Sequence, residues 1–153
     1  YVFHKKKFTM YTVKDILETK GSNTISVDPD ATVYDALKKM AGNNIGAVLV
    51  VKDDKVCGIF SERDYARKII LMGKTSRDSK VGDLMTDRVY AVKLATTVTD
   101  CMKLMTEHRV RHLPVVENEK LLGIVSIGDV VNKTIEAQNN TISQLEDYII
   151  GKR

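Results

Sequence analysis

The same order of apolar runs and polar turns occurs twice along the chain. In the first half the apolar run AVLVV (47–51) is followed by the polar segment KDDK and by the second run VCGIF (56–60). In the second half LPVV (113–116) is followed by ENEK and LLGIV (121–125). Short apolar runs bounded by turn residues are typical of buried strands. Each half therefore predicts a hairpin of two strands.

Amphipathic segments precede the two hairpins. Thr32 and Thr97 are candidate N-caps, because an acidic residue follows each of them three positions later, as in a capping box. Short extended stretches, TISV (24–27) and VYAV (89–92), lie before these helices, and a further helix is expected after Ser61 and after Ser126. A separate tail helix is expected at TISQLEDYII (141–150). The apolar positions at helical spacing are Val33, Ala36, Leu37 and Met40, and Val98, Cys101, Met102 and Met105.

The sequences of the two halves align with an offset of 65 residues, so that TVYDALKKM matches TVTDCMKLM and VCGIFSERD matches LLGIVSIGD. We interpret the chain as an internal duplication. The predicted fold is α/β, with two tandem strand-helix-strand-strand-helix repeats packed about a pseudo-twofold axis, because one unit of this size has too small a core to stand alone. The expected divisions are an N-terminal extension (1–11), repeat 1 (12–73), a linker (74–80), repeat 2 (81–137) and a C-terminal helix or tail (138–153).

Composition narrows the class of protein. Of the 153 residues, 43% are hydrophobic and 29% are charged, and no apolar run reaches the ~20 residues that span a bilayer. We therefore expect no membrane association and no signal peptide. The two cysteines, Cys57 and Cys101, form no metal or disulfide spacing, which favours core positions, reduced thiols and a cytoplasmic location. The net charge of +4 permits anionic partners but does not identify one.

Both hairpins end in Gly, two apolar residues, Ser, two variable residues and Asp. The motif residues are Ser61 and Asp64 in repeat 1, and Ser126 and Asp129 in repeat 2. One interpretation is helix capping, in which the serine and the aspartate satisfy backbone groups at a helix start. The other is ligand binding, in which the helix N-terminus receives a phosphate and the carboxylate receives the vicinal hydroxyls of a ribose. The residues alone leave both interpretations open.

Candidate phosphate-binding cations differ between the halves. Arg63 and Arg67 lie one helical turn apart after Ser61, whereas Arg111 and His112 enter the first hairpin strand of repeat 2. Arginine suits forked contacts to phosphate, although exposed cations can also be ordinary surface charge. Where repeat 2 has Arg111 and His112, repeat 1 has Gly46 and Ala47.

The two motifs with their matching flanks resemble the tandem CBS-domain family (cystathionine β-synthase type, or Bateman module), in its stand-alone branch. The resemblance covers about Thr12 to Ala137. It implies a regulatory module without catalysis that binds AMP, ATP, NAD(H) or a related adenosine ligand and forms a homodimer, a flat disk of four repeats, that acts on an unidentified regulated protein. It places Asp64 and Asp129 at ribose hydroxyls and Ser61 and Ser126 by the phosphate or ribose. It places the adenine against residues near Thr24 and Ile25, and near Thr86 and Val89.

From the difference between the halves we expect two unlike clefts. A compact pocket with Arg111 and His112 near Ser126 suits AMP, and its binding is expected to tighten toward about pH 6 as His112 gains a proton. An open pocket with Arg63, Arg67, Gly46 and Ala47 suits a dinucleotide such as NAD(H).

Other functions are weaker alternatives. His108 and His112 are four residues apart, but Arg109 and Arg111 intervene and no third ligand is near in sequence, so we expect no metal. An enzyme acting on the bound nucleotide would need a general base, for which Glu62 is the only candidate identified. The basic balance allows a nucleic-acid-binding module, yet the aromatic strands and zinc-finger spacings typical of such modules are missing.

Overall fold

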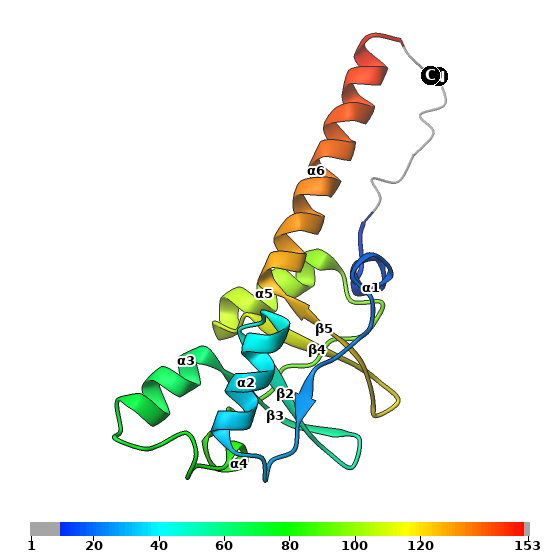
Figure 1. The fold of residues 1–153 in the computed structure, drawn as a ribbon. Helices are drawn as coiled ribbons and strands as arrows, with labels where there is room; N and C mark the ends of the chain where they lie inside the picture. The colour runs from blue at the N-terminus through cyan, green and yellow to red at the C-terminus, as the bar shows by residue number, and fades with distance from the viewer. Residues whose placement is uncertain (1–9, 152–153) are drawn as a thin grey trace.

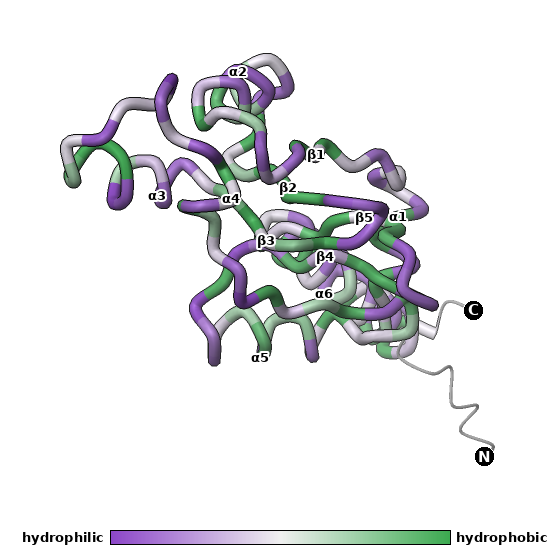
Figure 2. The backbone as a smooth tube through the Cα atoms, turned by 90° about the horizontal axis from the view of Figure 1, so that it is seen from below, coloured by the Kyte–Doolittle hydropathy of each residue, from purple (hydrophilic) through white to green (hydrophobic). Residues whose placement is uncertain are grey.

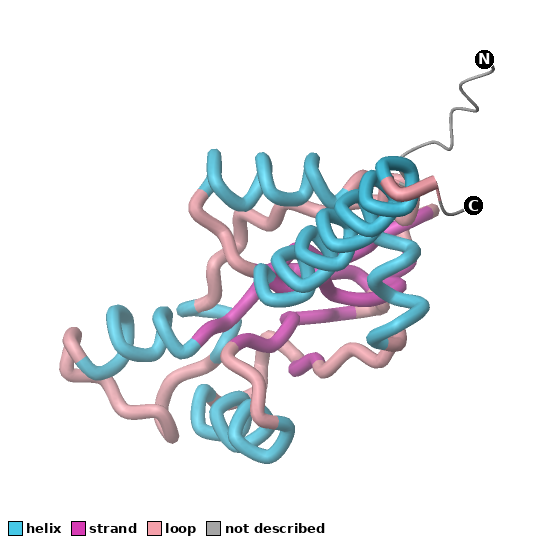
Figure 3. The backbone as a smooth tube through the Cα atoms, turned by 90° about the horizontal axis from the view of Figure 1, so that it is seen from above, coloured by secondary structure: helices cyan, strands magenta, loops and turns pink. Residues whose placement is uncertain are grey.

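Two small β-sheets, one from each half of the chain, form the centre of the structure, with helices around them (Figures 1 and 3). The computed structural model describes residues 10–151. Within that range the first sheet has the strand order β1-β2-β3, with β1 (Ser26–Val27), β2 (Ala47–Lys52) and β3 (Lys55–Ser61), and the second pairs β4 (His112–Glu117) with β5 (Lys120–Ser126). The strands coincide with hydrophobic stretches of the chain (Figure 2). The predicted α/β class with two tandem units is confirmed.

The two predicted hairpins are present and are built alike. Each has a two-residue turn with positive φ at both positions, which matches the twist of paired strands: 51° and 61° at Asp53 and Asp54, and 50° and 64° at Asn118 and Glu119. The register shifts after Val50 in one hairpin and after Val115 in the other, at equivalent positions. The extended stretch at 89–92 forms only a single parallel bridge, Val92 to Val115, so it is not a full counterpart of β1.

Helices α2 (Val33–Asn43) and α5 (Val98–His108) begin where the sequence predicts. The hydroxyl of Thr32 accepts a hydrogen bond from the Asp35 N–H, and that of Thr97 accepts one from the Asp100 N–H, each at 3.1 Å. Each helix buries one apolar face against its own hairpin. The predicted caps are therefore confirmed.

The helices that follow the hairpins differ from each other. After Ser61 a short α3 (Glu62–Asp64) continues as a π-helical segment, η1 (Tyr65–Ile70). After Ser126 a single helix, α6 (Ile127–Ile149), runs for 23 residues and extends away from the sheets (Figure 1). The expectation of a separate tail helix at 141–150 is wrong. Neither Gly nor Pro occurs between Asp129 and Ile149, so nothing terminates the helix at the end of the repeat.

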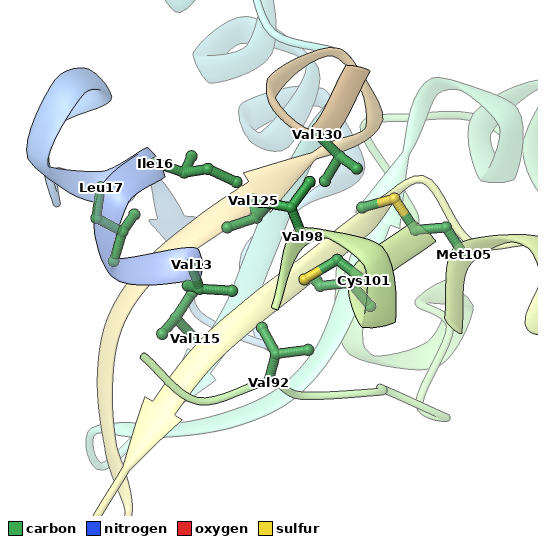
Figure 4. Packing of buried hydrophobic residues seen from close by; sticks show 11 residues of the cluster. Val13, Ile16, Leu17, Val92, Val98, Cys101, Met105, Val115, Val125 and Val130 are labelled. Atoms are coloured by element: carbon green, nitrogen blue, oxygen red, sulfur yellow. The ribbon is translucent and has the colours of Figure 1, made fainter. Parts of the chain in front are cut away.

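Each half contributes a helix to the core of the other. Helix α1 (Val13–Lys20) packs against β4, β5 and α5 through Val13, Ile16 and Leu17 (Figure 4). Helix α4 (Val81–Leu84) buries Val81 and Leu84 in the core of the first half. Because of this exchange, the predicted boundaries at 12–73 and 81–137 separate the two repeats in the sequence, but each hydrophobic core contains residues from both repeats. The proposed extension at 1–11 lies largely outside the described residues.

The glycines that open the two motifs allow close approach of these exchanged segments. A Cβ on Gly58 would lie 2.7 Å from the backbone oxygen of Thr86 and 2.7 Å from the sulfur of Met85. A Cβ on Gly123 would lie 2.8 Å from Cδ2 of Leu17, a side chain that can rotate. The segment at Thr86 is instead anchored by two backbone hydrogen bonds to Ile59, of 3.0 and 2.9 Å.

We expect Gly58→Ala to lower the free energy of unfolding by about 1–3 kcal/mol, the usual cost of overpacking. Gly123→Ala serves as the matched control and should cost less, since its clash is with a flexible side chain. Urea denaturation of both variants measures the difference. An equal or larger cost at Gly123 would contradict the argument.

Candidate functional site

Both Ser-x-x-Asp motifs cap the helices that follow them. Ser61 Oγ accepts a hydrogen bond from the Asp64 N–H (3.2 Å), and Asp64 Oδ2 accepts one from the Ser61 N–H (3.0 Å). The same reciprocal pair joins Ser126 and Asp129, at 3.2 and 2.8 Å. The capping interpretation is therefore correct for both motifs. Capping does not decide whether either motif also binds a ligand, because the other groups around the two carboxylates differ.

Asp64 is almost buried and is held by the second half of the chain. Only 9% of the residue is exposed. Its Oδ1 accepts a hydrogen bond from the Thr86 hydroxyl (3.1 Å) and forms an ion pair with Lys68 Nζ (3.2 Å). Lys68 also donates to the backbone oxygen of Leu84 at 3.0 Å. The carboxylate therefore lies where the end of β3 meets the segment exchanged from the second half.

A cleft of about 630 Å³ opens at Asp64, a size typical of small-molecule sites. We call it the Asp64 cleft. Its walls come from α3 and η1 on one side, and from residues 86–90 and the end of α5 on the other. The residues that line it are Gly46, Ile59, Ser61, Glu62, Arg63, Asp64, Arg67, Lys68, Thr86, Arg88, Val89, Tyr90, His108, Arg109, Val110, Arg111 and His112.

The Asp64 cleft is strongly cationic. Six lysine and arginine side chains line it, against the two carboxylates of Glu62 and Asp64. Within residues 10–151, none of its five arginines forms an ion pair; Lys68 alone of these cations does, with Asp64. Guanidinium groups that converge without an anionic partner suit a ligand with phosphate groups.

Sequence reasoning expected Arg111 and His112 in a different pocket from Arg63 and Arg67. Arg111 and His112 do lie beside Ser126, since His112 pairs with Ser126 and the Arg111 carbonyl accepts a hydrogen bond from the Ile127 N–H at 2.9 Å. They are not separated from Arg63 and Arg67, however, because all four residues also line the Asp64 cleft. The exchange of segments brings residues 86–90 of the second half against β3, where Thr86 and Ile59 share two backbone hydrogen bonds. Nine predicted residues line the cleft: Gly46, Ser61, Arg63, Asp64, Arg67, Thr86, Val89, Arg111 and His112. Five do not line it: Thr24, Ile25, Ala47, Ser126 and Asp129.

Asp129 is held by a cation of the chain itself. Lys20, in the last turn of α1, places its Nζ 2.7 Å from Asp129 Oδ2 and donates to the backbone oxygen of Ile124 at 2.9 Å. Burial raises the pKa of the Asp129 carboxyl, but the Lys20 hydrogen bond and charge and the Ser126 hydrogen bonds outweigh it, so the pKa is below its ordinary value. Lys20 therefore occupies the position in which a ligand cation or hydroxyl would meet this carboxylate.

The pKa of His112 is not the ordinary value that the sequence suggested. Burial, then the charge of Lys20 and more weakly that of Arg111, lower its pKa below the ordinary 6.5, although Asp129 acts in the opposite direction. The lowered pKa opposes protonation of His112 near pH 6, so the expected tightening of binding at that pH gains no support from this environment and stays a prediction. His108 stacks on Tyr90, with ring centroids 3.9 Å apart and an interplanar angle of 15°.

Other candidate chemistry is limited. Within residues 10–151 no group of three or more His, Cys, Asp or Glu side chains could hold a metal ion. Burial and the neighbouring Asp100 carboxylate raise the pKa of Cys101 to about 11, so this thiol stays protonated in the core. Over the same range no helix is long and apolar enough to cross a bilayer.

Sequence reasoning missed several residues of the Asp64 cleft and also the lysine that pairs with Asp129. Lys68 was not among the candidate cations, although its position four residues after Asp64 is the spacing of an ion pair on a helix. Arg88 lies beside the predicted Thr86 and Val89, and Arg109 beside Arg111, so proximity in sequence could have indicated both. Nothing in the sequence pairs Lys20 with Asp129, 109 positions away.

Comparison with known proteins identifies the family. The family model for the CBS domain matches residues 12–71 and 81–136. The CBS domain-containing protein CBSX3, mitochondrial, of Arabidopsis thaliana is 40% identical, over 94% of this chain and 74% of its own length. A candidate signal-transduction protein with CBS domains from Burkholderia ambifaria is 45% identical, with a TM-score of 0.79 over 82% of this chain and 94% of that one.

A further solved structure shares the fold at 23% identity, with a TM-score of 0.73 over 82% of this chain and 97% of that one. It is a CBS domain pair in complex with methylthioadenosine and S-adenosyl-L-methionine. The repeated hairpins, the exchanged helices and the duplicated motif agree with these matches. The chain belongs to the CBS-domain family, whose paired repeats form a regulatory module.

Proposed function

We propose that this protein is a regulatory sensor that binds an adenine nucleotide, AMP, ATP or NAD(H), in the Asp64 cleft. The observation behind the proposal is the meeting, in one cleft, of a nearly buried carboxylate and five arginines without ion pairs. A ribose hydroxyl at Asp64 Oδ1 replaces the Thr86 hydroxyl or the Lys68 ammonium, both of which are on side chains that can rotate away. The phosphates then lie toward the arginines.

The adenosine ligands of the structural neighbour support this class of ligand. The arrangement of the cleft also suggests how binding is transmitted. Asp64 and Arg67 come from the first half of the chain, while Thr86 and Arg111 come from the second. A ligand that contacts all four favours the relative arrangement of the halves in which they converge, which is a population shift.

Three related expectations stay predictions. These are the homodimer that forms a flat disk of four repeats, the unidentified regulated protein, and the cytoplasmic location. The name of the Arabidopsis relative places that protein in mitochondria. The division into one AMP cleft and one NAD(H) cleft is a fourth expectation of this kind, although the cations assigned to its two clefts all line the Asp64 cleft.

Calorimetric titration with adenosine, AMP, ATP and NADH at one ionic strength tests the proposal. We expect one ligand per chain and an affinity that rises with the number of phosphates. Arg111→Ala should weaken ATP binding about fivefold, close to 1 kcal/mol, and leave adenosine binding unchanged. Arg77→Ala is the matched control, since Arg77 lies outside the cleft and stacks over the Tyr34 ring at 4.2 Å.

The same titrations discriminate the alternatives. Equal affinities for adenosine and ATP, or no binding of any of the four, would overturn the proposal. Conversion of ATP or NADH during the titration, abolished by Glu62→Gln, would favour an enzyme, since Glu62 lines the cleft. Tight binding of an oligonucleotide with a steep dependence on salt would favour a nucleic-acid-binding module.

A further inference from the structure

Exposed apolar side chains gather on the long C-terminal helix. Among the described residues, α2 has one large hydrophobic side chain that is exposed, Tyr34, and α5 has none. Helix α6 instead exposes many, and its C-terminal half projects beyond the other elements (Figure 1). These include Ile127 (45% exposed), Val131 (44%), Ile135 (49%), Ile142 (52%), Leu145 (49%) and Ile149 (79%).

The spacing of these side chains is that of a coiled coil. From Val131 onward the steps alternate between four and three residues and define one stripe: Val131, Ile135, Gln138, Ile142, Leu145 and Ile149. We call this set the α6 stripe. At 100° per residue it lies roughly a third of a turn from the helix face of Val130 and Lys133, which is buried against the body of the protein. The stripe and the buried face therefore do not compete for the same neighbours.

The kinds of residue in the stripe select a second helix of the same sequence. One heptad position holds Ile135, Ile142 and Ile149, and the other holds Val131 and Leu145, a combination that favours two parallel strands. The remaining member, Gln138, is the single polar residue. In a parallel pair in register it faces its own copy, and an amide is both donor and acceptor, so the two can bond to each other.

The residues that flank the stripe also permit self-pairing. In a parallel pair, Thr134 faces Asn139 of the second copy, and Thr141 faces Glu146 of the second copy. No like charges meet at these positions, so two identical helices do not repel each other there. We propose that the α6 stripe binds the α6 stripe of a second copy of this chain, as a parallel two-stranded coiled coil.

Sedimentation equilibrium of the whole chain at about 10–100 μM tests the association. The expected result is a dimer for the unaltered protein and a dissociation constant at least about tenfold higher for Ile142→Asp, whether or not the bodies of the two copies also pair in the predicted disk. Ser143→Asp is the matched control, because Ser143 is exposed on α6 away from the stripe and the added charge is the same; this variant should remain a dimer. Position 142 lies on the part of α6 that projects beyond the other elements, so its substitution should not change the stability of the folded chain. Urea denaturation at a protein concentration low enough to dissociate the dimer should therefore give the same midpoint for all three proteins.

A monomeric unaltered protein would overturn the proposal, as would a dimer whose dissociation constant Ile142→Asp leaves unchanged. Covalent capture tests the orientation. With Cys57 replaced by serine, Leu145→Cys should form a disulfide-linked dimer on mild oxidation, since position 145 faces itself in a parallel pair. Linkage only in the double variant Ile135→Cys, Leu145→Cys would show antiparallel helices, in which the two heptad positions face each other, and would contradict the parallel arrangement.

Discussion

Asp64→Ala is expected to weaken nucleotide binding by about 10- to 100-fold, whereas Asp129→Ala should leave the affinity nearly unchanged. The first figure corresponds to about 1.5–3 kcal/mol, the range for a hydrogen bond to a charged group. Asp64 lies in the cationic cleft, while Asp129 is paired with Lys20 and does not line that cleft. The family resemblance alone placed both carboxylates at ribose hydroxyls and therefore predicted a loss of affinity at both positions. Calorimetric titration of ATP into the two variants measures the difference.

The two substitutions form a matched pair, because each removes the acidic member of a capping box. Both should therefore lower the free energy of unfolding, by roughly 1 kcal/mol. An affinity that falls equally in both variants, or in neither, would contradict the assignment of the ligand to the Asp64 cleft. The stability measurement shows whether a loss of binding is only a loss of folded protein.

Asp129 also gives a pH dependence with a defined sign. Its pKa is below the ordinary value in the folded protein, so its contribution to stability is complete above the unfolded-state pKa of about 3.9. That contribution is lost as the pH falls through the lower folded-state pKa. The difference in unfolding free energy between the unaltered protein and Asp129→Ala should therefore shrink below about pH 4.

Ile16→Ala is expected to lower the free energy of unfolding by about 2–5 kcal/mol, the usual cost of truncating a buried isoleucine. Ile16 is 4% exposed and lies in the core of the second half, although it belongs to the first repeat in the sequence (Figure 4). Glu18→Ala, on the exposed side of the same helix, is the control and should change stability by less than about 0.5 kcal/mol. Urea denaturation compares the two.

A fragment that starts at residue 81 tests the same exchange. It lacks Val13, Ile16 and Leu17, so the face of β4, β5 and α5 that they cover is left open. We expect no cooperative unfolding transition from this fragment. If it unfolds cooperatively, or if Ile16→Ala costs no more than Glu18→Ala, helix α1 is not needed by the second core.

Much of the site could be predicted because its parts are local. Ser61 and Asp64 form a motif of four residues, and Arg67 lies one helical turn further on. Thr86 and Val89 followed from the family resemblance, and both line the cleft. The grouping of these parts could not be predicted, because Arg111 meets Asp64 only after the exchanged segments have packed. The ion pair between Asp129 and Lys20 depends on the same packing.

The sequence by itself determined the duplication, the two hairpins and the capped helices, because apolar spacing, turn residues and N-cap residues act over a few positions. It also indicated the family and Asp64, which lines the candidate site. Only the tertiary structure decided which helix completes which core and that the predicted cations share one cleft. These features arise from contacts between segments far apart in the chain, and such contacts produce no periodic pattern in the sequence.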